Sequence, residues 1–142
     1  MDRRALIAAI ATTLVAPGAT WAQSPAVQGD PIALVREIMA AYTADKPHDP
    51  PYTPAVANRL RRAEIGADFI LDAQDVDVKN VTVTGLSAAA DRAEVEARFL
   101  SFDQPRQVKF DFRVVDGRWM IANVRDQNGF DLRRTLRLPP LP

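Results

Sequence analysis

The chain of 142 residues contains no cysteine and a single histidine, His48. Without cysteine there is no disulfide, no catalytic thiol and no thiolate-bound metal, so stability must come from the burial of apolar side chains. One histidine excludes metal sites built from several imidazoles and leaves His48 as the sole possible histidine base. No serine stands in a nucleophile-elbow pattern. The sequence therefore predicts no catalytic residue and no cofactor.

The chain also lacks an excess of charge of either sign, with 18 basic and 18 acidic residues. A nearly neutral domain has no electrostatic footprint for nucleic acid and no basic arm for anionic lipid. The composition therefore excludes nucleic acid as a partner and leaves a protein or a small ligand, neither of them identified by the sequence.

The beginning of the chain has the pattern of a secretory signal peptide. Met1–Arg4 is short and basic, Ala5–Val15 is almost entirely apolar, and small residues precede a cleavage point after Ala22. The apolar run is shorter than the roughly 20 residues that a membrane-spanning helix requires. We predict a signal peptide over residues 1–22, a periplasmic mature protein, and no stable membrane anchor after cleavage.

Two helices are expected before residue 67. A polar, flexible leader over residues 23–30 ends at Asp30, which is expected to cap a helix over residues 31–44 that begins with Pro31. Thr53 and Pro54 repeat this start and predict a second helix. Its apolar stripe consists of Val56, Leu60 and Ala63, and Gly66 is expected to end it.

From Asp75 onward apolar residues alternate with polar ones, which is typical of strands with one buried face. The alternation predicts strands near residues 81–84, 92–99 and 108–114. Asp116-Gly117 is a strong hairpin signal, and the strand expected after it, near residues 118–124, is apolar on both sides. In the last strand Trp119 and Ile121 are expected on one face, with Met120, Ala122 and Val124 on the other.

The predicted fold class is α+β, with two N-terminal helices packed on one face of a curved antiparallel sheet of about four strands. A short closing helix is expected near Leu132–Leu136. The predicted organisation is a single domain over residues 31–138 and a disordered tail over residues 139–142.

Three segments carry a resemblance to a known family: Asp68–Asp75, Gly117–Ile121 and Asp131–Leu136. Together with the strand pattern they resemble a family of secreted bacterial proteins catalogued as a domain of unknown function, number 3828. The resemblance covers about Pro31 to Leu136 and implies a nuclear transport factor 2-like, or cystatin-like, cone fold and an address in the cell envelope. It implies no activity.

The acidic run Asp68, Asp72, Asp75 and Asp77 is a candidate metal site. Hard cations such as Ca²⁺ prefer carboxylate oxygens, and Asp72, Asp75 and Asp77 are the predicted ligands, although the spacing is not that of an EF-hand. The alternative is that these aspartates cap local structure and pair with Arg59, Arg61 and Arg62 on the preceding helix.

A candidate ligand site comprises Arg59, Arg62 and Trp119. Arginine forks suit carboxylate and phosphate groups, and tryptophan is a frequent anchor of binding surfaces. The alternative is a solvated helix face for the arginines and a core position for Trp119. His48, in a proline-rich loop, is expected to be exposed.

Three functions remain open from the sequence. The first is an exported, non-enzymatic binding or interaction module. The second is a small cone-fold enzyme that uses an aspartate base and Tyr42 or Tyr52 as acid. The third is an immunity or inhibitor protein that acts outside the cytoplasm. A pocket that holds Asp and Tyr together favours the enzyme, whereas an interior filled by Phe99, Phe110 and Trp119 favours the module.

Overall fold

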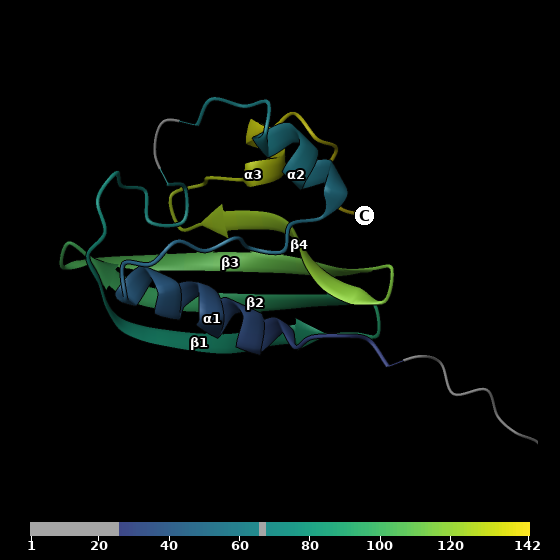
Figure 1. Cartoon of the computed structure of the whole chain (residues 1–142), viewed down its shortest axis with the longest axis horizontal. Coiled ribbons are helices and arrows are strands. Elements are labelled where there is room, and N and C mark those ends of the chain that lie inside the picture. Colours follow the sequence, from purple (N-terminus) through teal and green to yellow (C-terminus); the bar gives the residue numbers. More distant parts are fainter. Residues whose placement is uncertain (1–25, 66–67) are drawn as a thin grey trace, which may run out of the picture.

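The computed structural model describes residues 26–65 and 68–142. The expected signal peptide, residues 1–22, lies outside this described part. The elements of the described part are α1 (Pro31–Thr43), α2 (Pro54–Leu60), β1 (Val78–Ala88), β2 (Arg92–Ser101), β3 (Gln104–Val115), β4 (Arg118–Asp126) and α3 (Leu132–Thr135). Figure 1 shows a curved sheet with α1 lying across β1 and β2 and with α2 and α3 near β4. The predicted α+β class and layout are confirmed.

Helix α1 begins as predicted. The Asp30 side chain accepts a hydrogen bond of 2.9 Å from the Ile32 amide, and Pro31 occupies the first turn, where its missing N–H breaks no helical bond. The residues buried along α1 recur at intervals of three and four and form one apolar face, which packs on β1 and β2: Val35, Ile38, Met39 and Tyr42.

Helix α2 is shorter than the sequence indicates. It ends at Leu60, because the backbone hydrogen bonds beyond it change to a tighter spacing. The Arg62 amide donates to the Arg59 carbonyl, three residues back instead of four. Ala63 is exposed and does not extend the buried stripe, so that part of the prediction was wrong. The expected stop at Gly66 lies outside the described residues. In the described part of the chain, no helix is long and apolar enough to cross a membrane.

The four strands are antiparallel in the order β1-β2-β3-β4. The predicted alternation on β2 and β3 is confirmed, since their inward residues pair across the strands and are 5% exposed or less. These pairs are Ala93 with Phe112, Val95 with Phe110, and Ala97 with Val108. The interior is therefore filled by aromatic and β-branched side chains between the sheet and α1.

Strand β4 departs from the simple alternation. Phe110 pairs with Val124 and Phe112 pairs with Ile121, so β4 carries one extra residue between the two pairs. This β-bulge turns both Ile121 and Val124 toward the core, where both are fully buried. The prediction that they face opposite sides was wrong, because a bulge shifts the register of every later side chain.

The outer edge of β4 is covered by segments from elsewhere in the chain. Ile121 donates to the Pro51 carbonyl at 2.7 Å and accepts from the Thr53 amide at 2.9 Å. Gln28, within the expected leader, donates to Gly117 at 2.8 Å and accepts from Trp119 at 3.1 Å. These bonds satisfy backbone groups that an open edge would leave free.

Candidate functional site

A hollow of about 620 Å³ lies between the end of α1 and the loop that follows α2. Its polar lining consists of Tyr42, His48, Tyr52, Asp68 and Gln74. The structure thus brings together the aspartate and the tyrosines that an acid–base enzyme of this fold would use. What these groups can do depends on which of their hydrogen-bonding positions are already occupied.

Asp68 is engaged on both carboxylate oxygens. Its Oδ1 accepts from the amides of Ile70 at 2.8 Å and Leu71 at 3.2 Å, and its Oδ2 accepts from the Tyr42 hydroxyl. The first two bonds form a local turn, and the third joins α1 to the loop. In this arrangement Asp68 acts as a clamp between two segments that lie 26 residues apart in sequence.

The hydroxyl groups of both tyrosines in this hollow have a raised pKa. Burial, followed by the hydrogen bond to Asp68, raises the pKa of Tyr42 well above its ordinary value, and burial also raises the pKa of Tyr52. A general acid works best when its pKa lies near the working pH, so a raised pKa makes either hydroxyl a poor proton donor at neutral pH. The clamp therefore has the properties of a structural element.

His48 is half-buried, whereas the sequence predicts an exposed side chain. Its ring meets the ring of Tyr42 edge to face, with centroids 4.3 Å apart and an interplanar angle of 68°. The expectation was wrong because the segment that follows His48 turns back to bond Ile121 through Pro51 and Thr53, which brings the histidine onto the end of α1.

A second hollow, of about 660 Å³, shares Pro50 and Tyr52 with the first. Trp119 is half-buried there and shares the lining with Arg61 and Arg118. Of the predicted ligand residues, Arg59 and Arg62 are exposed and do not line this hollow. The structure therefore pairs Trp119 with arginines other than those proposed from the sequence.

The acidic run is divided among different partners. Asp72 lies 3.8 Å from Arg106 and Asp77 lies 3.6 Å from Lys79, while Asp75 is exposed. Within residues 26–65 and 68–142, no group of three or more His, Cys, Asp or Glu side chains is placed to hold a metal ion. A calcium site formed by Asp72, Asp75 and Asp77 stays a prediction.

The basic partners of this run differ from those expected. Sequence reasoning placed them on the helix before the run, at Arg59, Arg61 and Arg62, but the structure supplies them from β3 and β1. That pairing prediction was wrong, because nearness in sequence is a poor guide once the chain turns into the sheet.

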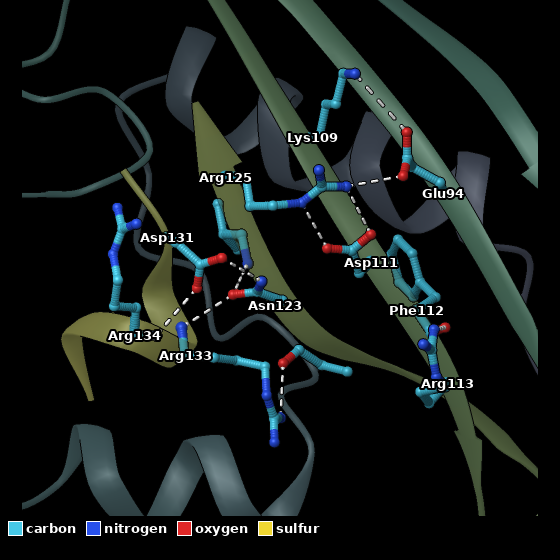
Figure 2. A network of polar contacts seen from close by, with 12 residues as sticks. Glu94, Lys109, Asp111, Phe112, Arg113, Asn123, Arg125, Asp131, Arg133 and Arg134 are labelled. Carbon is cyan, nitrogen blue, oxygen red and sulfur yellow. Dashed lines mark hydrogen bonds and ion pairs between the residues drawn. The ribbon is translucent and has the colours of Figure 1, made fainter. Parts of the chain in front are cut away.

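The outward face of the sheet carries a network of opposite charges (Figure 2). The Arg125 guanidinium bonds both oxygens of Asp111 at 2.9 Å and one oxygen of Glu94 at 2.8 Å. Lys109 lies 3.9 Å from the other oxygen of Glu94. Because two cations meet two anions, the charges within this network largely cancel.

The same view shows how α3 joins the sheet (Figure 2). The Asn123 amide oxygen accepts from the Arg133 amide at 3.0 Å, and the Asn123 amide nitrogen donates to Asp131 at 3.3 Å. The Arg133 side chain also donates to the Ala122 carbonyl at 3.1 Å. Asn123 is 5% exposed, so its polar atoms serve the attachment of α3 rather than a ligand.

Sequence reasoning missed Arg106. This side chain is buried, donates to Asp126 at 3.2 Å and to the Ile70 carbonyl at 3.0 Å, and so ties the loop over residues 68–77 to the sheet. A signal was present, since Arg106 occupies an inward position in the alternation of Val108 and Phe110. A charge in that position indicates a buried partner.

The exposed Phe102 was also missed. It lies in the turn between β2 and β3 and is 49% exposed, the largest fraction among the exposed large apolar side chains in the described part of the chain. The sequence signal was weak, since Phe102 is an aromatic residue between the strands predicted near residues 92–99 and 108–114, where turn-forming residues are expected.

Comparison with known proteins gives one fold relationship. No family model matches the chain, and no curated protein matches it significantly. The resemblance to the domain of unknown function 3828 and to nuclear transport factor 2-like cones therefore stays a prediction. Among solved structures, the chain is similar to the immunity protein Tai3 in the type VI native effector–immunity complex Tae3–Tai3 from Ralstonia pickettii.

The likeness to Tai3 has a TM-score of 0.53 and 22% sequence identity. It covers 70% of this chain and 97% of the other, so nearly all of that smaller protein has a counterpart here. At this level of identity the comparison shows a shared fold.

Proposed function

We propose that this chain is an exported immunity-type protein, which binds a protein effector outside the cytoplasm and blocks its action. The observation that carries the proposal is the fold shared with Tai3 over 97% of that protein, which itself forms an effector–immunity complex. The predicted signal peptide over residues 1–22 supports the proposal, because export would place the protein in the compartment that an exported effector enters.

The geometry of the hollows supports a binding role. Asp68 is occupied by three hydrogen bonds, and the raised pKa of Tyr42 disfavours proton donation. The interior is filled, with Phe99 3% exposed and Phe110 fully buried, which is the arrangement that favours an interaction module. Trp119 is half-buried: it packs against this core and also lines the second hollow.

The proposal is tested by contact competition between strains of the producing bacterium. A strain without this gene should be outcompeted by its parent on a solid surface, where effectors pass between touching cells. A plasmid that encodes the full chain should restore survival, and one that encodes the chain without residues 1–22 should not. Equal survival of the deletion strain and its parent would refute the immunity role.

A cone-fold enzyme is the second candidate, favoured by the meeting of Asp68, Tyr42 and Tyr52 around one hollow. Residues 23–142, once purified, should then turn over an ester, phosphate or peptidoglycan substrate. Tyr52→Phe is the informative variant, because the Asp68 clamp to Tyr42 stays intact. We expect no turnover, and reproducible turnover that Tyr52→Phe abolishes would place this candidate first.

A further inference from the structure

The β2–β3 hairpin carries an exposed aromatic side chain at its tip. Phe102 and Asp103 form the two-residue turn, both with a left-handed backbone, at φ +49° and φ +59°. Half of the Phe102 surface faces solvent. In Figure 1 this turn lies at the left end of the sheet, beside the loop that leads into β1.

These residues are unusual for such a turn. Two-residue hairpins with positive φ at both positions favour Asn-Gly or Asp-Gly, because a side chain on an L residue crowds this backbone. The β3–β4 hairpin follows that preference with Asp116-Gly117, at φ +50° and φ +73°. The stability of the turn alone would therefore favour a residue other than phenylalanine at position 102.

The position of Phe102 is fixed by its neighbours. Its amide donates to the Asp77 carbonyl at 3.2 Å, and Lys79 lies 3.6 Å from Asp77 and 3.5 Å from Asp103. Val76, next to Asp77, is 40% exposed and adds a second apolar side chain. We name Val76, Asp77, Phe102 and Asp103 the hairpin tip. A turn whose backbone is held in place before binding loses less entropy when a partner covers it.

The charge around the hairpin tip is acidic. Asp75, Asp77 and Asp103 stand against one ammonium group, that of Lys79, which gives a local net charge of −2. The Asp103 side chain is 78% exposed. A partner that covers this surface must offer an apolar pocket for Phe102 and basic side chains around the pocket, because like charges opposed across an interface are destabilising.

We propose that the hairpin tip is the surface by which this chain binds its effector, and that the effector presents an apolar pocket bordered by lysine or arginine. This inference rests on the proposed immunity function. Buried aromatic anchors at the centre of an interface commonly account for most of the binding energy. The turn lies at the end of the sheet, where a partner can approach it (Figure 1).

The test uses the competition assay with three versions of the full chain: wild type, Phe102→Gly and Leu86→Ala. Leu86 is the matched control, since it is 43% exposed and lies near the other end of the sheet on β1. Phe102→Gly should lose protection while keeping its level in the envelope fraction and its Tm, and Leu86→Ala should protect fully.

A photo-crosslinking amino acid at position 102 or 86 then reports contact directly in the same cells. We expect a crosslink to one protein from position 102 and none from position 86. For that protein, once purified, Phe102→Gly should weaken Kd by about tenfold or more, and added salt should weaken it further.

The results of these experiments distinguish failure of the hairpin-tip proposal from failure of the immunity role. Protection by wild type, with equal protection by Phe102→Gly and no crosslink from position 102, would overturn the hairpin tip and leave the immunity role standing. Failure of wild type itself to protect would overturn the immunity role and, with it, this inference.

Discussion

Two hairpin turns of the same backbone shape close the two ends of β3, and their sequences differ. Asp116-Gly117 is the sequence that such a turn favours, and its glycine has no neighbouring atom within 4 Å of an added Cβ. Phe102-Asp103 adopts the same left-handed conformations, which aspartate tolerates but a bulky residue such as Phe102 seldom adopts.

The two turns differ in how well the local sequence suits the backbone conformation. At Asp116-Gly117 the local sequence and the fold agree, as they do along most of a natural chain. At Phe102-Asp103 they conflict, and the conflict coincides with an exposed aromatic side chain. Strained backbone of this kind persists where the surrounding structure determines it and is concentrated at functional sites.

The largest expected loss of stability comes from a substitution in the core that lies between the two turns. Phe110 is fully buried between the sheet and α1, so Phe110→Ala should lower the free energy of unfolding by about 3–5 kcal/mol. Urea unfolding followed by tryptophan fluorescence measures the change. An unchanged midpoint would mean that β3 does not form the centre of the core.

Arg106→Ala should remove support from the hairpin-tip end alone. It leaves the buried Asp126 without its cation and frees the Ile70 carbonyl, although the amides of Asn128 and Phe130 still bond Asp126. We expect a loss of about 2–3 kcal/mol, below the usual value for breaking a buried pair.

Arg92→Ala is the matched control for Arg106→Ala. Arg92 pairs with Asp91 on the surface, and exposed pairs contribute about 0–1 kcal/mol. Equal losses for the two variants would show that Arg106 is not a buried anchor.

Tyr42→Phe should release the other anchor of the 68–77 loop, at a cost of about 1–2 kcal/mol, because Asp68 loses a hydrogen-bond donor. The pKa of Tyr42 is raised in the folded state, so its contribution is complete below the unfolded value of about 10 and is lost as the pH rises above it. The variant should therefore show a shallower decline of stability in alkali.

The same reasoning applies to the spectrum of the native protein. The chain has two tyrosines, and burial raises the pKa of both. Tyrosinate absorbance should appear only as the protein unfolds. Ordinary titration near pH 10 with the fold intact would contradict the buried clamp.

Helix α1, the alternation of β2 and β3, and the Asp116-Gly117 turn were predictable from sequence because caps, period and turn chemistry are local properties. The contacts that build the candidate sites were not. The Tyr42–Asp68 clamp and the Arg106–Asp126 pair join residues 26 and 20 positions apart, and no local pattern encodes such distances.

The bulge in β4 was unpredictable for a different reason. Residues 119–122 are apolar without interruption, so the sequence marks no single buried face, and only the pairing with Phe110 and Phe112 reveals that Ile121 and Val124 share one face. Register depends on the neighbouring strand as well as on the strand itself.

Gly117→Ala should add backbone strain at a position that glycine now occupies without strain. The added Cβ meets no atom, so the cost is that of the backbone alone, about 1 kcal/mol at φ +73°. A fall in Tm of a few degrees is expected. No change would show that positive φ carries little cost in this hairpin.

Phe102→Gly should have the smallest effect on stability. Relief of the left-handed strain is offset by the greater freedom of glycine in the unfolded chain and by the loss of partial burial, so the change should stay below about 1 kcal/mol. A loss of several kcal/mol would mean that Phe102 is part of the core.

The most direct test of the account is amide hydrogen exchange of this chain with and without the protein that crosslinks from position 102. Binding should slow exchange at residues 75–79 and 101–104 and leave exchange at the Asp116-Gly117 turn unchanged. Protection confined to the Asp116-Gly117 end, with exchange at residues 101–104 unaltered, would contradict it.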